Sequence, residues 1–413
     1  MDIYGFLKEH DAVSFHMPAH KNRVPFIFND ITEIYGADNL RNPTGIIKNS
    51  QKRAAEFLGG DMAYYLVNGA SSGLLASAMY LGGGDIAVDR NCHESVILGL
   101  VMSGGFPHYI YPKIDKDFDI PVPITKNPYP YPLVYTAVTY YGKAVKGLEN
   151  ISFCVADEAH GAHFYFSSEL KKLRAENADI NILSFHKTLP SLTQTAVMLA
   201  KKNVDFDLLE RCKNAVTSTS PSYPLMASLD YAVANGSNVM ENAQTEMICG
   251  LKEKIQNKTD FLVYASDDPY KLLLNFKKSK ISAAETEKFL RERYNIFIEG
   301  IFGDNLLFML SPYNTEAETE LLFEALSKLN NVKSEKTAKE KIPVLQFETV
   351  ISPREAFFAK SERVSVNSAV GKIAAENITL FPPCVPIVSL GEKITKEAAY
   401  YISKERESIL IVK

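Results

Sequence analysis

The 413-residue sequence predicts an α/β fold built on a mostly parallel sheet. Between residues 64 and 200, short apolar runs typical of strands alternate with helix-like runs. Such alternation is typical of a parallel sheet with helices on both faces. Polar residues directly follow several of the apolar runs, where open α/β sheets place their ligands. The remaining chain is long enough for one or two smaller units.

The composition excludes several classes of protein. An apolar content of 46% and a charged content of 23% are typical of a globular protein. The net charge of −4 gives no signature of nucleic-acid binding, and no apolar run is long enough to span a membrane. No signal peptide is evident. The five scattered cysteines, without a Cys-x-x-Cys pair, favour reduced thiols in the cytoplasm and no metal site.

The first half of the chain is expected to hold the sheet. Residues 1–25 are expected to form an arm, and residues 50–60 a helix that ends at Gly59-Gly60. A helix is also expected over Leu74–Leu81. The predicted strands are Tyr64–Val67, Asp85–Val88, His108–Tyr111, Leu133–Val138, Phe153–Ala156, Ile180–Ser184 and Ala196–Ala200.

The segment 119–141 is unusual because it is rich in proline and tyrosine. Only about a dozen residues then separate the predicted strand ending at Val138 from the next one, which is close to the minimum for a parallel crossover. We therefore expect a shortened connection at this point.

The second half is expected to contain a long helix over residues 225–258 and two smaller units. We predict a major domain over residues 1–250, a small α+β domain over 251–332 and a C-terminal α+β domain over 343–413. A charged linker over Lys333–Lys341 precedes the last one. In the small domain we expect strands at Lys271–Phe276, Ile296–Ile298 and Asn305–Leu310 and a helix at Glu316–Leu329. The last strand is expected at Ile409–Val412.

Three sequence patterns carry candidate chemistry. Lys187 and His186 follow the buried run Ile180–Leu183, and a lysine in such surroundings can become a neutral, nucleophilic amine. Asp157 ends a predicted strand, and the adjacent Glu158 would face the opposite way. Upstream, the Gly/Ser-rich turn 69–73 precedes a helix and could bind an anion. An exposed lysine, a strand-end cap and an ordinary loop are the simpler interpretations.

An anion-binding turn, a strand-end aspartate and a lysine, in this order, resemble the pyridoxal-phosphate enzymes with the aspartate-aminotransferase fold. More closely, the sequence resembles the ornithine/lysine/arginine decarboxylases of that fold. The similar strings span nearly the whole chain in family order. They are residues 14–21, 66–73, 89–96, 157–163, 184–190, 217–223, 352–359 and 381–386.

The resemblance implies the mostly parallel, seven-stranded sheet of the fold-type-I pyridoxal-phosphate transferases. It also implies pyridoxal 5'-phosphate as cofactor. Lys187 would bind the cofactor as a Schiff base, and Asp157 would keep its pyridine nitrogen protonated. His93 would stack on the ring. Either His93 or a nearby acid would return a proton to the substrate. Lys187, His93 and Asp157 are thus the expected catalytic residues.

The resemblance also implies the remaining cofactor contacts. The phosphate would lie against the turn that begins with Gly69 and Ala70. The side chains of Ser71, Ser72, Ser184 and His186 would complete its site. His160, next to Ala159, would contact the phenolic oxygen of the cofactor, unless it is a structural histidine.

A homodimer with shared active sites is a further implication, and a higher oligomer is compatible with it. Thr219 or Ser220 would reach the phosphate of the neighbouring subunit. A plain polar loop before Pro221 is the alternative for either residue. Neither nucleic acid nor a membrane is expected as a partner.

The implied reaction is decarboxylation of arginine, lysine or ornithine to the corresponding amine. The carboxylate that binds the distal cation of the substrate stays open among Asp38, Glu94 and Glu376. The chain departs from the family strings at three positions, which bear Ala19 for glycine, Glu94 for lysine and Cys384 for glycine. Because Ala19 stands where the family strings have glycine, the arm could run differently.

Two alternatives remain open on sequence grounds. One is a different reaction on the same fold, an aminotransferase or a β-eliminase. An aminotransferase would need an arginine for the α-carboxylate, for which Arg41 and Arg354 are the candidates. The other is a degenerate or regulatory protein that binds pyridoxal phosphate. The intact set of Ser71, His93, Asp157, His186 and Lys187 argues against it.

Overall fold

The computed structural model describes residues 13–15, 33, 36–240, 243–329, 345–379 and 385–413. The positions Ala19 and Cys384 and the predicted linker Lys333–Lys341 lie outside these residues, as does nearly all of the expected N-terminal arm.

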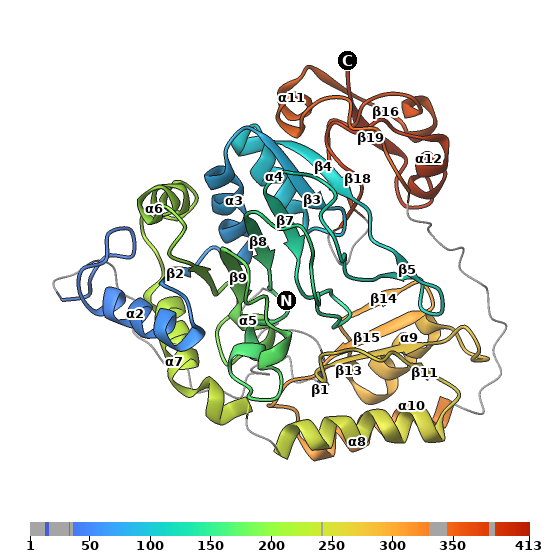
Figure 1. Ribbon diagram of the computed structural model, residues 1–413. Coiled ribbons are helices and arrows are strands. Elements are labelled where there is room, and N and C mark those ends of the chain that lie inside the picture. Colours follow the sequence, from blue (N-terminus) through green and yellow to red (C-terminus); the bar gives the residue numbers. More distant parts are fainter. Residues whose placement is uncertain (1–12, 16–32, 34–35, 241–242, 330–344, 380–384) are drawn as a thin grey trace.

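A seven-stranded sheet forms the centre of the molecule, and it contains all seven strands that the sequence predicts (Figure 1). Strand β10 runs antiparallel to both of its neighbours, whereas the other pairings in this sheet are parallel. The predicted α/β class with a mostly parallel sheet is therefore confirmed. In spatial order the strands are β2 (Met62–Leu66), β10 (Ala196–Ala200), β9 (Ile180–Ser184), β8 (Cys154–Asp157), β7 (Leu133–Thr136), β3 (Asp85–Asp89) and β4 (Phe106–Ile110).

Helices cover both faces of this sheet because side chains alternate along each strand. In β2, Tyr65 packs into a core that includes helices α2 (Ile46–Leu58) and α7 (Tyr223–Met240). Its neighbour Tyr64 packs into the opposite core. That second core is covered by α3 (Gly69–Leu81), α4 (Glu94–Ser103) and α6 (Phe206–Ala215). Figure 1 shows α3 and α4 side by side along the sheet.

The connection from β7 to β8 is short, as the sequence predicts. Residues 137–153 are all described and form turns and isolated bridges without a helix. Upstream, the proline- and tyrosine-rich segment contains the small hairpin of β5 (Ile114–Asp115) and β6 (Ile120–Pro121). The shortened connection leaves its residues near the carboxyl ends of the strands.

A second, antiparallel sheet follows, in the spatial order β11 (Leu262–Val263), β12 (Lys271–Asn275), β15 (Asn305–Met309) and β14 (Gly300–Phe302). It is accompanied by α8 (Ala243–Lys258), α9 (Ala283–Tyr294) and α10 (Glu316–Lys328), and α8 packs against α10.

Two expectations for this region were wrong in detail. The predicted helix over 225–258 is two helices, α7 and α8, on either side of residues 241–242. The predicted strand Ile296–Ile298 is present as β13 (Ile296–Phe297), but it pairs with β1 (Val13–Ser14) rather than with the four-stranded sheet. A pairing with so distant a segment leaves no local signal in the sequence.

The C-terminal part has its own apolar core. Its elements are α11 (Pro353–Phe358), β16 (Ser361–Ser365), β17 (Ile378–Thr379), β18 (Pro386–Val388), α12 (Lys396–Ile402) and β19 (Ser408–Val412). β19, which contains the predicted last strand, pairs with β16. The buried Arg90 joins this part to the main sheet, since it donates to Glu392 at 3.0 Å and to the Pro386 carbonyl at 2.6 Å.

Candidate active site

A cavity of about 420 Å³ lies at the carboxyl ends of the parallel strands. We call it the strand-end cavity. Parallel α/β sheets bind ligands at this edge, because loops that follow several strands meet there. Ten of the thirteen residues singled out from the sequence line it. They are Gly69, Ala70, Ser71, His93, Asp157, Ala159, His160, Ser184, His186 and Lys187.

Lys187 lies in the single-turn helix α5 (Phe185–Thr188), which starts directly after β9. The preceding Phe185 is fully buried and packs edge-on against Phe166. Lys187 itself is half-buried, and its Nζ lies 3.1 Å from Nε2 of His160. The amine of Lys187 is therefore held at the cavity by an anchored turn.

Asp157 and Glu158 lie on opposite sides of the chain, as the alternation of an extended strand requires. Asp157 lines the strand-end cavity, and its Oδ1 accepts a hydrogen bond from the Ala159 amide at 3.0 Å. Glu158 is fully buried elsewhere. Its carboxylate accepts from Tyr165 Oη and from Asn181 Nδ2, both at 2.7 Å. Of these two carboxylates, Asp157 is therefore the one that faces the cavity.

His93 occupies the N-cap position of α4. Its Nδ1 accepts from the amide of Ser95 at 3.2 Å and lies 2.7 Å from the hydroxyl of the same residue. Burial lowers the pKa of His93, and the nearby Lys187 lowers it further, against the opposing charge of Asp157. A neutral, oriented imidazole therefore faces the cavity.

Gln194, which follows Lys187 in the sequence, holds the Gly/Ser-rich turn 69–73 in place. Gly69 has a φ of +77°, which favours glycine, and its amide donates to the Gln194 carbonyl at 2.9 Å. Gln194 also donates through Nε2 to the Val67 carbonyl at 2.7 Å. The first turn of α3 therefore presents its amide groups at the cavity, where an anion can accept from them.

The serine and histidine side chains expected at a phosphate differ in whether they line the cavity. Ser71 is exposed at the cavity, whereas Ser72 is buried and donates to the Gly69 carbonyl at 2.8 Å. On the other side, Ser184 Oγ lies 3.2 Å from His186 Nδ1. Of the four side chains expected at a phosphate, only that of Ser72 does not line the cavity.

Thr219 and Ser220 are exposed and lie between α6 and α7. They do not line the strand-end cavity of their own chain. Together with Ser72 they are the three expected site residues that the structure places outside it.

Several lining residues were missed in the sequence. Thr136 is the last residue of β7, and Asn91 and Tyr140 come from the loops that follow β3 and β7. Glu299 comes from the turn between β13 and β14. Tyr140 donates to Glu299 Oε1 at 2.5 Å. Each stands at the end of a predicted strand or in the proline- and tyrosine-rich segment. That position was the available signal.

Lys271, at the start of β12, is the most informative residue that the sequence left unnoticed. It is 1% exposed, and its Nζ lies 3.2 Å from Nδ1 of His160. His160 thus lies between Lys187 and Lys271. Burial, followed by the charges of these two lysines, holds the pKa of His160 well below its usual range.

The carboxylates considered for a distal cation have other partners. Asp38 accepts from the amides of Thr44, Gly45 and Ile47 at 2.8 to 2.9 Å, where it stabilises the start of α2. Glu376 accepts from the Leu410 amide at 2.7 Å within the C-terminal part. Neither they nor Glu94 line the strand-end cavity.

Both candidate arginines serve the fold. Arg41 donates to the carbonyls of Asn214 and Thr217 at 2.7 and 3.0 Å. Arg354 donates to those of Val101 and Met102, both at 3.0 Å. Among the described residues, no arginine lines the strand-end cavity. The feature expected of an aminotransferase is therefore missing from this part of the chain.

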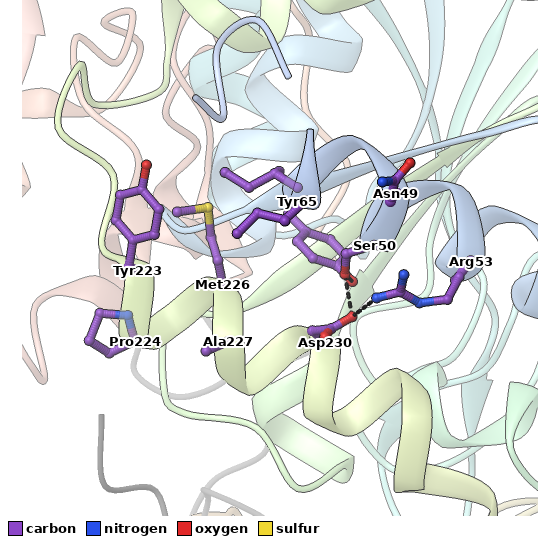
Figure 2. Close-up of a pocket in the computed structure, with 11 residues that line it drawn as sticks. Asn49, Ser50, Arg53, Tyr65, Tyr223, Pro224, Met226, Ala227 and Asp230 are labelled. Atoms are coloured by element: carbon purple, nitrogen blue, oxygen red, sulfur yellow. Dashed lines mark hydrogen bonds and ion pairs between the residues drawn. The ribbon is translucent and has the colours of Figure 1, made fainter. Parts of the chain in front are cut away.

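A second cavity, of about 550 Å³, lies between α2 and α7 (Figure 2). We call it the α2–α7 pocket. Figure 2 shows Ser50 and Arg53 pointing at Asp230, with Tyr223 at the opposite end. Arg53 bonds to Asp230 at 2.8 Å, so the charges in this pocket are paired with each other. The pocket is mainly apolar, and Ile46 at its edge is 60% exposed.

The family models match most of the chain. The model described as "Orn/Lys/Arg decarboxylase, major domain" matches residues 9–266, and the corresponding C-terminal domain model matches residues 334–408. An arginine decarboxylase of Bacillus subtilis is 32% identical over 99% of this chain and 94% of its own. The constitutive lysine decarboxylase of Escherichia coli is 22% identical over 87% of this chain and 68% of its own.

Solved structures agree on the fold. The structure of the E. coli constitutive lysine decarboxylase superposes with a TM-score of 0.80 at 19% identity, over 99% of this chain and 81% of that one. The Francisella novicida lysine decarboxylase gives a TM-score of 0.76 at 18% identity, over 91% and 73%.

Two features are absent from the described residues. None of their helices combines the length and apolarity that a membrane crossing requires. The same residues contain no group of three or more histidine, cysteine or acidic side chains arranged to hold a metal ion.

Proposed function

The chain belongs to the Orn/Lys/Arg decarboxylase family, and on that premise we propose that it decarboxylates a basic amino acid with pyridoxal 5'-phosphate as cofactor. One observation carries the proposal: Lys187, Asp157 and His93 line one cavity at the carboxyl ends of the sheet. The bound cofactor would supply an electron sink for the bond that releases CO2.

The residues of the cavity fit this cofactor. The amine of Lys187 would bond to its aldehyde, and the carboxylate of Asp157 would pair with its ring nitrogen. The first turn of α3, with Ser71, Ser184 and His186, would hold its phosphate. The flat, neutral imidazole of His93 would cover one face of the ring.

Glu299 is our proposal for the carboxylate that binds the distal cation of the substrate. Of the described residues that line the cavity, only Asp157 and Glu299 carry a carboxylate. Glu299 is 8% exposed and already accepts from Tyr140, so a cation there would meet an oriented, weakly solvated carboxylate. Because several relatives that are 30% identical or more are named arginine decarboxylases, arginine is the first substrate to test.

The decisive experiment measures CO2 release from arginine, lysine and ornithine in separate incubations. The protein is loaded with pyridoxal 5'-phosphate, and Lys187→Ala serves as the control. We expect release from one of the three and a loss on the order of 10³-fold or more in the control, which lacks the nucleophile. A loaded protein that forms a 2-oxo acid instead of CO2 would establish the aminotransferase alternative.

Glu299→Gln tests the substrate assignment. Removing the charge should raise KM for the preferred substrate by about tenfold or more, since one charged hydrogen bond contributes about 1.5–3 kcal/mol. Glu94→Gln is the matched control, because Glu94 was an equally open candidate in the sequence. A KM that rises for Glu94→Gln and stays constant for Glu299→Gln would assign the binding of the distal cation to Glu94 instead.

We further propose that the protein forms a homodimer whose active sites are shared. We also propose that it works in the cytoplasm. Thr219 and Ser220 are exposed and lie outside the cavity of their own chain, as residues that serve a second copy must. The adjacent apolar α2–α7 pocket is compatible with burial between two copies. Sedimentation should give a dimer, and Thr219→Ala with Ser220→Ala should weaken cofactor binding. A monomer with full affinity contradicts this proposal.

A further inference from the structure

Three basic side chains form a row that begins at the strand-end cavity and continues into the buried interior. Lys187 Nζ lies 3.1 Å from Nε2 of His160, and Lys271 Nζ lies 3.2 Å from Nδ1 of the same ring. Both imidazole nitrogens are therefore engaged by a lysine. His160 is 7% exposed and Lys271 is 1% exposed, so water cannot substitute freely for either contact.

The hydrogen-bond chemistry of the row limits its protonation. A neutral imidazole has one N–H and one lone pair, and an ammonium group can only donate. With His160 neutral, one lysine donates to it as an ammonium, and the other must accept from it as a free amine. A neutral His160 agrees with the pKa of this ring, which burial and the two lysines keep well below its usual range.

The surrounding charges decide which lysine keeps its proton. Burial lowers the pKa of Lys271 to about 8, against the opposing influence of the buried carboxylates of Asp268 and Glu299, and a charge on Lys187 lowers it further. Lys271 is therefore an ammonium at pH 7. Among the described residues, the other charged or titratable groups that face the row include His93 and His186, which face His160, and Asp157, which lines the same cavity as Lys187. Lys271 then donates to Nδ1, and the proton of His160 lies on Nε2, directed at Lys187.

We propose that Lys271 is a positioning residue that acts through His160 to keep Lys187 a neutral, nucleophilic amine. The inference rests on the proposed function, which requires such an amine before the cofactor binds. Lys271 belongs to the second, four-stranded sheet, and it lies 111 positions from His160 in the sequence.

The stem of Lys271 is held in place for this role. Gly142 has a φ of +84°, and a Cβ added to it would lie 2.8 Å from Cγ of Lys271. Any other residue at position 142 would collide with the lysine. The glycine thus permits the shortened β7–β8 connection to pack directly on Lys271.

The test measures the titration of Lys187 in the full-length protein freed of cofactor. Acetic anhydride labels neutral amines, and mass spectrometry of the Lys187 peptide reports the extent of labelling at each pH. In Lys271→Met we expect the apparent pKa of Lys187 to rise by about one pH unit or more, because its ammonium can then donate to His160. Labelling at pH 7 should fall about tenfold.

Three variants make the result specific. Lys271→Arg keeps the charge and should keep most of the labelling. Lys252→Met is the matched control, because burial also lowers the pKa of Lys252 to about 8, yet its Nζ bonds to Ser266 Oγ at 3.3 Å instead of to His160. It should leave Lys187 unchanged. Lys271→Gln, a second neutral replacement, serves if circular dichroism shows that Lys271→Met is unfolded.

Two outcomes overturn the inference. One is an unchanged titration of Lys187 in a folded Lys271→Met or Lys271→Gln protein. The other is a full additional shift when Lys271→Met is combined with His160→Leu, since the effect would then bypass the ring. The labelling needs neither cofactor nor turnover. A shifted titration in a protein that releases no CO2 would therefore refute the proposed function alone.

Discussion

The two sides of the chain at the end of β8 place neighbouring carboxylates in opposite surroundings. On one side, Asp157 faces a cavity together with Lys187 and His160, and His160 also contacts Lys271. On the other, Glu158 is buried and accepts from a tyrosine hydroxyl, an asparagine amide and the Ala175 backbone amide. One set of polar groups borders open space, whereas the partners of the other are all within the protein.

This difference separates groups that serve chemistry from groups that serve stability. A buried carboxylate with a full set of donors contributes to the folded state, and its loss leaves those donors unpaired. Like charges gathered at a cavity cost stability and persist where function requires them. We therefore expect substitutions on the cavity side to change activity and those on the Glu158 side to change the free energy of unfolding.

Asp157→Asn should produce the largest effect. The amide cannot keep the ring nitrogen of the cofactor protonated, so kcat should fall on the order of 10²-fold or more. The shape is preserved, and the thermal unfolding temperature should stay close to that of the unchanged protein. Steady-state CO2 release and a thermal melt check both statements. Normal turnover would remove Asp157 from the proposed mechanism.

Glu158→Gln should have the converse effect. The glutamine NH2 would face donors that now point at a carboxylate, which should cost about 1–3 kcal/mol of unfolding free energy. Urea unfolding measures this cost. Activity per folded molecule should remain unchanged, and a selective loss of kcat at constant stability would erase the contrast with Asp157.

Lys271→Met should have the smallest effect on stability, and it should stabilise the protein, whereas Glu158→Gln should destabilise it. The folded protein binds the proton of Lys271 less tightly than the unfolded chain does, because its pKa falls from 10.5 to about 8. At pH 7 this costs up to about 3 kcal/mol of stability, and the loss of the contact with His160 offsets part of the gain, so the variant should be more stable by about 1 kcal/mol. The cost disappears as pH rises from about 8 to 10.5. Urea unfolding at both ends of this range should therefore show the advantage of the variant vanish.

A variant that is less stable at pH 7, or whose advantage grows with pH, would contradict this assignment of charge. Either outcome would also place Lys271 with the groups that serve stability.

The sequence alone was sufficient for the sheet and for one wall of the site. Seven apolar runs became the seven strands, and the polar residues after them line one cavity. A strand and the turn that follows it are local in the chain, so composition and alternation reveal both. The same alternation places the side chains of Asp157 and Glu158 on opposite sides of the chain. The division into three domains stays a prediction.

Only the tertiary structure decided the opposite wall. Lys271 and Glu299 come from the second sheet and its flanking turn, and Tyr140 comes from the shortened connection. As single residues next to ordinary strands they carry no periodic signal. Their meeting with His160 depends on how two sheets pack, which is a long-range contact. The sequence therefore determined which residues carry the proposed chemistry, and the packing of the two sheets determined which charges surround them.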